Sequence, residues 1–132
     1  QMHMNERGTK MEWKLDDSRS IWPQLKEQLM RAIVSGEYVE GEPFPTVRQL
    51  AQDAGVNRNT MQRAMAELEV AGLLITNRTA GRTVTTDNVL IAEIKEQLAE
   101  QNIENYLKEM TALGYTPQEA IEVMNKKGVS DR

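Results

Sequence analysis

The stretch TVRQLAQDAGVNRNTMQRAMAEL, residues 46–68, decides the fold, because two short helical patterns meet in it at a glycine. Thr46 and Gln49 have the spacing of a capping box, in which each side chain accepts a hydrogen bond from the backbone N–H of the other. Gly55 is suited to end the first helix, and Asn57 is suited to cap the second. Apolar residues at spacings of three and four predict the buried face of the second helix, made of Met61, Ala64, Met65 and Leu68. Together the two patterns predict a helix-turn-helix.

The other face of the second predicted helix carries long hydrogen-bonding side chains. Asn59 and Arg63 point away from the apolar face, and Gln62 lies on its shoulder. Arg58 lies in the first turn. The major groove of DNA admits an α-helix, and Asn, Gln and Arg side chains form paired hydrogen bonds with base edges there. A solvated face is the alternative, and for an isolated helix it would be the better interpretation. The elements on both sides favour DNA.

These flanking elements complete a winged helix-turn-helix. Upstream, residues 20–36 show apolar residues at helical spacing, with Pro23 in the first turn and Gly36 after the last. Downstream, the β-prone residues 73–75 and 83–85 flank a loop, which predicts a hairpin, or wing. We expect a mainly α fold with a small β-hairpin wing.

From residue 88 the pattern becomes one long helix of roughly 24 residues followed by a shorter one. Thr116 and Glu119 repeat the capping-box spacing at the start of the shorter helix. One face of this tail is too apolar to stand alone, and a symmetric partner is the simplest cover. We predict a flexible N-terminal tail at 1–11, a winged helix-turn-helix domain at 12–87 and a dimerisation tail at 88–132. The predicted dimer contacts are Ile91, Ile94, Leu98, Ile103, Tyr106, Leu107 and Met110.

Charge is distributed unevenly along the 132 residues, whose formal net charge is −4. Residues 43–86 contain five arginines, no lysine and three acids, whereas residues 88–132 contain five basic and eight acidic residues. Arginine has the planar fork that suits phosphate and guanine edges. The local excess of arginine therefore points to nucleic acid in spite of the net charge.

Other classes of function find little support in the sequence. There is no cysteine, and the one histidine is His3, so we expect neither a metal site nor a cofactor. No nucleophile–base pair or phosphate loop points to an enzyme. Glu93, Glu96, Glu100 and Glu104 fit a solvated helix face better than a catalytic or metal site. Without a long apolar run or a leader pattern, we expect a cytoplasmic protein that does not contact a membrane.

The run from IWPQL to RTAGRTV, residues 21–86, resembles the winged helix of the GntR family of bacterial transcription regulators. The family writes Leu-Pro-Ser-x-Arg where this chain has FPTVR at 44–48, and Val-Ser-Arg-x-Thr where it has VNRNT at 56–60. The short acidic helical tail is similar to the YtrA-like subfamily. The resemblance implies that Arg48, Arg58, Thr60 and the wing at Gly81 contact DNA. Arg48 would bind a phosphate or a guanine near it, and Thr60 would donate to a phosphate.

Two positions depart from the family pattern. Gln62 stands where the family commonly has a guanine-reading arginine, and Gln prefers adenine in the major groove. Thr83 stands where an aromatic residue usually closes the wing. We therefore expect a different base at one operator position and a less firmly packed wing tip. Arg78 and Arg82 are the wing's candidate contacts to the minor groove or to phosphates.

We predict a sequence-specific regulator, a repressor acting as a homodimer on a pseudo-palindromic operator. The alternative is a winged-helix module that docks a protein instead of DNA. A small-molecule effector is left open: two helices cannot enclose a cavity of roughly 300 Å³. Any inducer would have to bind between subunits or between the tail and the winged domain.

Overall fold

The computed structural model describes residues 11–79 and 81–130. The chain forms two compact units, residues 1–95 and 96–132. The predicted flexible tail at 1–11 lies outside the described residues except for Met11. The predicted second domain begins at Asn88, where the helix α4 (Asn88–Ala112) starts, and the unit boundary lies inside that helix. The roles of the predicted domains stay predictions.

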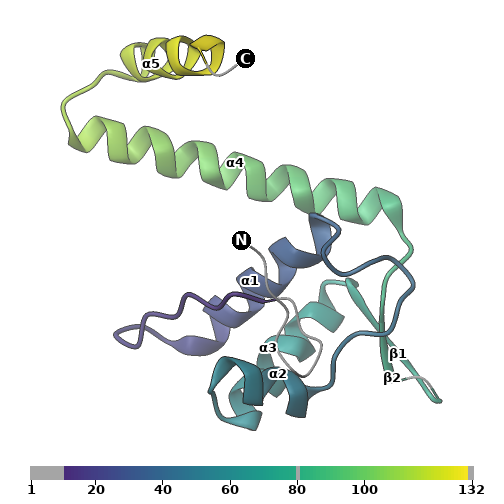
Figure 1. Cartoon of the computed structure of the whole chain (residues 1–132). Helices are drawn as coiled ribbons and strands as arrows, with labels where there is room; N and C mark the ends of the chain where they lie inside the picture. The colour runs from purple at the N-terminus through teal and green to yellow at the C-terminus, as the bar shows by residue number, and fades with distance from the viewer. Residues whose placement is uncertain (1–10, 80, 131–132) are drawn as a thin grey trace. The chain divides into compact units, whose positions relative to one another are not determined.

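The first unit is a three-helix group with a hairpin beside it (Figure 1). Its helices are α1 (Ile21–Val34), α2 (Val47–Ala54) and α3 (Arg58–Val70), and α3 packs against both of the others. The hairpin consists of the antiparallel strands β1 (Leu74–Asn77) and β2 (Gly81–Val84). The predicted apolar face of α3 is buried, together with Leu25, Leu29, Leu50, Leu73, Leu74 and Val84. The mainly α fold with a small wing is thereby confirmed.

Local hydrogen bonds set the start of each helix in the helix-turn-helix. The capping box of α2 is present: Gln49 N donates to Thr46 Oγ1 at 3.1 Å, and Thr46 N donates to Gln49 Oε1 at 2.9 Å. Gly55 ends α2 with a φ of +70°, a left-handed conformation that glycine adopts without strain. Asn57 then caps α3 by accepting a hydrogen bond from Asn59 N at 2.7 Å. The first turns of both helices are thus fixed by their own sequences.

The hairpin has a second neighbour that the sequence did not reveal. Phe44 N donates to Arg82 O, and Gly41 N donates to Val84 O, both at 2.8 Å. Val84 N donates in return to Glu42 O at 3.0 Å. Residues 41–44 therefore run along β2 on the side away from β1, so β2 is hydrogen-bonded on both of its edges.

The segment before α1 is tied to the helices by side-chain amides. Gln28 bonds both the N–H and the carbonyl of Lys14, at 3.1 and 2.8 Å, and Gln24 bonds those of Asp16, at 2.8 and 2.9 Å. The indole N–H of Trp13 donates to Asp53 Oδ2 in α2 at 3.0 Å. These bonds make residues 13–16 part of the winged unit.

The second unit contains α4 from Glu96 onward and the helix α5 (Pro117–Ser130). Its capping box is present too: Glu119 N donates to Thr116 Oγ1 at 3.1 Å, and Thr116 N donates to Glu119 Oε1 at 2.8 Å. The Tyr106 hydroxyl donates to the carbonyl of Ala120 at 2.7 Å, and Ala120 is buried. These contacts join α4 to α5 within the unit.

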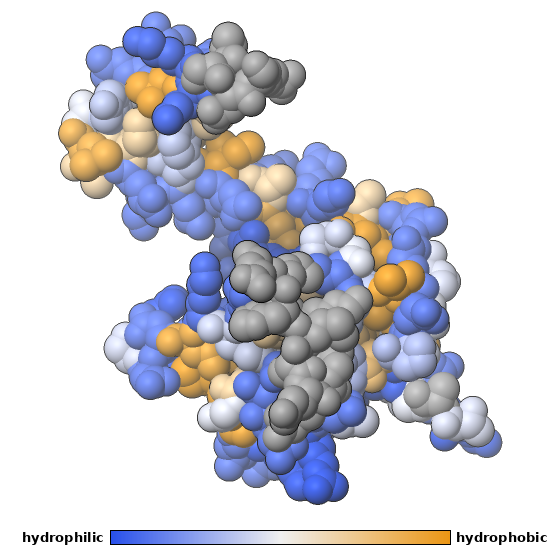
Figure 2. Space-filling view, in the orientation of Figure 1, coloured by the Kyte–Doolittle hydropathy of each residue, from blue (hydrophilic) through white to orange (hydrophobic). Residues whose placement is uncertain are grey.

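Several apolar side chains of the second unit face solvent. Figure 2 shows them as orange side chains among the blue surface of the tail helices. Among the residues predicted for the dimer, Ile94 and Leu98 are buried, Ile91, Tyr106, Leu107 and Met110 are half-buried, and Ile103 is 52% exposed. The other large apolar residues that are exposed in the described part of the second unit are Leu113, Tyr115, Ile121, Val123 and Met124. Within the described ranges, none of the helices has the length and hydropathy needed to cross a bilayer.

Candidate nucleic-acid interface

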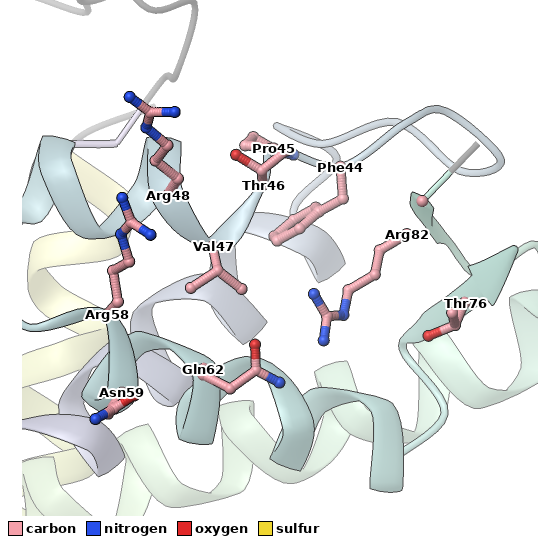
Figure 3. Close-up of a pocket in the computed structure, with 11 residues that line it drawn as sticks. Phe44, Pro45, Thr46, Val47, Arg48, Arg58, Asn59, Gln62, Thr76 and Arg82 are labelled. Atoms are coloured by element: carbon pink, nitrogen blue, oxygen red, sulfur yellow. The ribbon is translucent and has the colours of Figure 1, made fainter. Parts of the chain in front are cut away.

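A hollow of about 600 Å³ opens between the start of α2, the first half of α3 and the hairpin (Figure 3). Its polar lining comes from all three elements: Thr46 and Arg48, then Arg58, Asn59 and Gln62, then Thr76 and Arg82. Figure 3 shows Arg48 and Arg58 on one side, Arg82 reaching in from the other, and the Gln62 amide pointing into the space between them. The hollow collects most of the residues that sequence reasoning assigned to DNA. We call it the interface hollow.

Two arginines of the interface hollow stand at the starts of helices. Arg58 is the first residue of α3, Arg48 is the second of α2, and neither helix has an acid in its first turn. Helix N-termini carry partial positive charge, so a cation there adds to the positive potential and is unfavourable for folding. Both side chains are exposed, and no hydrogen bond or ion pair holds either of them among the described residues. This arrangement favours an anionic partner such as a phosphate.

The amides of Asn59 and Gln62 lie beside these charges. Both side chains are exposed, and both line the interface hollow. An amide offers one acceptor and two donors, which is the pattern that pairs with adenine in the major groove. The hollow therefore combines charge, which attracts any DNA, with groups that can distinguish bases.

Thr60 and Arg63 lie outside the interface hollow. Thr60 is half-buried and lines a separate hollow at the turn of the helix-turn-helix, next to Asn57 and Trp13. Arg63 is exposed, and its guanidinium carbon lies 4.3 Å from the centroid of the Trp22 ring in α1. This is a cation–π contact. Helical geometry explains the separation: Arg63 and Gln62 lie on opposite sides of Asn59, and Arg63 faces α1.

The wing contributes Gly81 and Arg82 to the interface hollow, while Arg78 is exposed and does not line it. Arg82 is partly covered and forms an ion pair with Glu69 of α3, with Nη2 at 3.1 Å from Oε1. The Thr76 hydroxyl of β1 also donates to Glu69. The hydrogen bond from Thr76 is the largest influence that lowers the pKa of Glu69, and Arg82 adds to it against the opposing effect of burial. In the sequence, Glu69 is one of three acids among residues 43–86, and nothing near it in the chain indicates this pairing.

Known proteins are similar to this chain in both sequence and fold. The family model described as "Bacterial regulatory proteins, gntR family" matches residues 23–84. The uncharacterized HTH-type transcriptional regulator YhcF of Bacillus subtilis (strain 168) is 31% identical over 112 residues, which cover 85% of this chain and 93% of YhcF. This chain belongs to the GntR family. A solved GntR family transcriptional regulator from Listeria monocytogenes is 36% identical, with a TM-score of 0.75, and the match covers 85% of this chain and 98% of that one.

Membership of the GntR family makes the chain a DNA-binding transcriptional regulator and not an enzyme. Both predictions are thereby confirmed. A further structural relative is YtrA from Sulfolobus acidocaldarius, a GntR-family transcription factor. It is 28% identical, with a TM-score of 0.52, and the match covers 66% of this chain and 97% of YtrA.

The departure from the GntR pattern at Thr83 has a structural counterpart in the wing. Its hydroxyl accepts a hydrogen bond from the Asn77 side-chain amide at 2.8 Å, across the hairpin. On the other side, Thr83 forms an isolated bridge with Pro43. The side-chain hydrogen bond to Asn77 stands where the family places an aromatic ring.

Proposed function

We propose that this GntR-family regulator is a repressor of the YtrA-like subfamily that binds a pseudo-palindromic operator as a homodimer. The observation that carries the proposal is the interface hollow, where Arg48 and Arg58, which have no charge partner among the described residues, stand beside the Gln62 amide. Such a repressor acts by occupying a promoter, and its place of action is the cytoplasm, where the bacterial chromosome lies. The short two-helix tail and the likeness to YtrA support the subfamily.

The proposal divides the contacts into anchors and readers. Arg48 and Thr60 anchor the domain on phosphates, which positions it without reading sequence. Arg58, Asn59 and Gln62 read base edges in the major groove, with adenine opposite Gln62. The remaining proposed contacts to DNA are Arg63, Arg78 and the wing at Gly81.

The tail joins two copies of the DNA-reading domain into a dimer in this proposal. Its exposed apolar residues, Ile103 among them, support a dimer in which each tail covers the other. Two linked reading domains gain effective concentration, so that weak single sites combine into useful affinity. The two half-sites are then expected about one helical turn, or a multiple of it, apart. A small-molecule effector would bind between subunits or between the tail and the winged domain.

Selection of bound sequences from a random DNA pool tests the proposal. The purified full chain is used at about 0.15 M salt, where non-specific attraction is screened. Recovery of an inverted repeat, together with a dimer mass in sedimentation, supports it. A single unrepeated site would refute the dimeric reader. No enrichment at all would refute sequence-specific reading by the isolated protein. It would favour a protein partner at the interface hollow.

A further inference from the structure

One carboxylate in α3 holds both strands of the wing. Glu69 Oε1 accepts from Arg82 Nη2 at 3.1 Å, and Oε2 accepts from the Thr76 hydroxyl. Thr76 and Arg82 are directly opposite each other in the register of β1 and β2. Glu69 therefore grips the same rung of the hairpin from both sides. We call these three residues the wing latch.

The wing latch is partly shielded from solvent. The Arg82 side chain is 21% exposed and the Glu69 side chain 28% exposed. Exposed ion pairs contribute little to stability because water and salt screen them, and partial cover reduces that screening. The pairing also competes with anything else that Arg82 could bind.

Arg82 has donor capacity that the wing latch leaves unused. Its Nε is buried and has no hydrogen-bond partner among the described residues. A guanidinium has five N–H donors and binds phosphate well. Figure 3 shows this side chain pointing into the interface hollow toward Gln62. Once freed from Glu69, Arg82 would be a third cation in the hollow, beside Arg48 and Arg58.

We propose that Glu69 is a positioning and specificity-determining residue, an inference that rests on the DNA-reading role proposed above. It fixes the wing beside α3 and withholds Arg82 from the phosphates of DNA. Phosphate contacts strengthen binding to every sequence equally, so an extra one dilutes the contribution of base readers such as Gln62. In this arrangement Arg82, for which the sequence predicted a contact to the minor groove or to phosphates, instead positions the wing through Glu69 and is not itself a DNA contact.

The test compares binding of the full chain to its selected duplex and to a scrambled duplex between 50 and 200 mM salt. The variants are Glu69→Gln, Arg82→Gln and the double variant, and the matched control is Glu67→Gln, which removes the same charge from the same helix. Thermal unfolding of each variant checks that it is folded. Each additional phosphate contact steepens the plot of log affinity against log salt by about 0.9, which is about a threefold greater loss of affinity over this fourfold range.

Glu69→Gln should bind the scrambled duplex more tightly, steepen the slope by about 0.9 and lower the preference for the selected duplex several-fold. Glu67→Gln should leave the slope unchanged. In the Arg82→Gln background, Glu69→Gln should no longer steepen it, because there is no guanidinium to release. Arg82→Gln alone should lower the preference by loosening the wing, without flattening the slope.

If the wild type prefers its selected duplex, three results would overturn this inference and leave the proposed function standing. Glu69→Gln and Glu67→Gln could behave alike, which would reduce Glu69 to a general negative charge. The Glu69→Gln effect could persist without Arg82. Arg82→Gln alone could flatten the slope by about 0.9, which would make Arg82 a phosphate contact in the native complex and would be decisive even if Glu69→Gln did not fold. A wild type that binds the two duplexes equally overturns the proposed sequence-specific function, and the inference fails with it.

Discussion

The two capping boxes of this chain form a natural experiment on how the start of a helix supports DNA binding. One begins α2 and the other begins α5, with the same Thr acceptor and similar bond lengths, 3.1 and 2.9 Å for Thr46 and Gln49 against 3.1 and 2.8 Å for Thr116 and Glu119. Only the first lies at the interface hollow, where Arg48 follows Thr46 by two residues. Removing either cap should therefore have similar local costs and different functional consequences.

The size of the effect follows from what each substitution removes. Thr46→Ala leaves Gln49 N without its side-chain acceptor, while Gln49 Oε1 can still accept from the backbone N–H of residue 46. Loss of an N-cap acceptor costs typically about 1 kcal/mol. The described part of the first unit, residues 11–79 and 81–95, has an unfolding entropy of roughly 0.2 kcal/mol per kelvin, so the melting temperature should fall by about 5 °C. Thr46→Ser keeps the acceptor and should recover most of this loss.

Calorimetry and DNA binding together make the comparison decisive. Gln49→Ala removes the hydrogen bond from the backbone N–H of Thr46 to the Gln49 side chain, which does not line the interface hollow. It should therefore weaken DNA binding only because the first turn of α2, which carries Arg48, becomes less ordered. Thr116→Ala should lower helicity without lowering the main melting transition, because α5 belongs to the other unit. Equal shifts for Thr46→Ala and Thr116→Ala would refute the reasoning, since they would mean that both units unfold as one.

Three further predictions follow from the interface hollow and the wing latch. Gln62→Ala should relax the preference at a single base pair, at a cost of about 1–3 kcal/mol there. Selection from a random pool, repeated with this variant, measures the preference at each position. A changed preference at any other base pair would contradict the assignment of Gln62. Arg48→Ala should weaken selected and scrambled duplexes alike and reduce the salt slope by about 1; loss of preference without a change in slope would mean that Arg48 reads a base. The pKa of Glu69 is held below its ordinary value of 4.5 by Thr76 first and then by Arg82. Because the folded-state pKa is the lower one, this contribution to stability is complete above about pH 4.5 and is lost as the pH falls through the folded-state pKa. Acid unfolding followed by circular dichroism should therefore be steeper for the wild type than for Glu69→Gln, and identical curves would contradict the latch.

Local chemistry explains why the helix-turn-helix could be predicted from the sequence. The capping box of Thr46 with Gln49, the αL glycine at Gly55 and the cap at Asn57 act within four residues of the backbone groups that they satisfy. The apolar spacing of α3 likewise depends only on the helical period. Such features are written next to one another in the chain, so a short stretch is enough to predict them.

The neighbours of the arginines could not be predicted in the same way. Trp22 lies under Arg63 because α1 packs on α3, and the sequence places the two residues far apart. Glu69 meets Arg82 only once the hairpin register is known, since a shift by one residue would turn Arg82 to the other face. The pairing of residues 41–44 with β2 was hidden because prolines and glycines there indicate a loop.

The arrangement of the arginines matters more for DNA binding than the net charge of residues 43–86. Arg63 is stacked on Trp22 and Arg82 is paired with Glu69, whereas Arg48 and Arg58 are held by no side chain among the described residues. Both of these stand at helix starts, where the backbone already contributes positive potential. A chain with a net charge of −4 can therefore present a positive field at one hollow, because its acids lie mostly elsewhere or neutralise arginines that serve other contacts. On this argument, the single change at Glu69 should alter affinity for DNA more than neutralising Glu67 does, because Glu69 holds Arg82 directly.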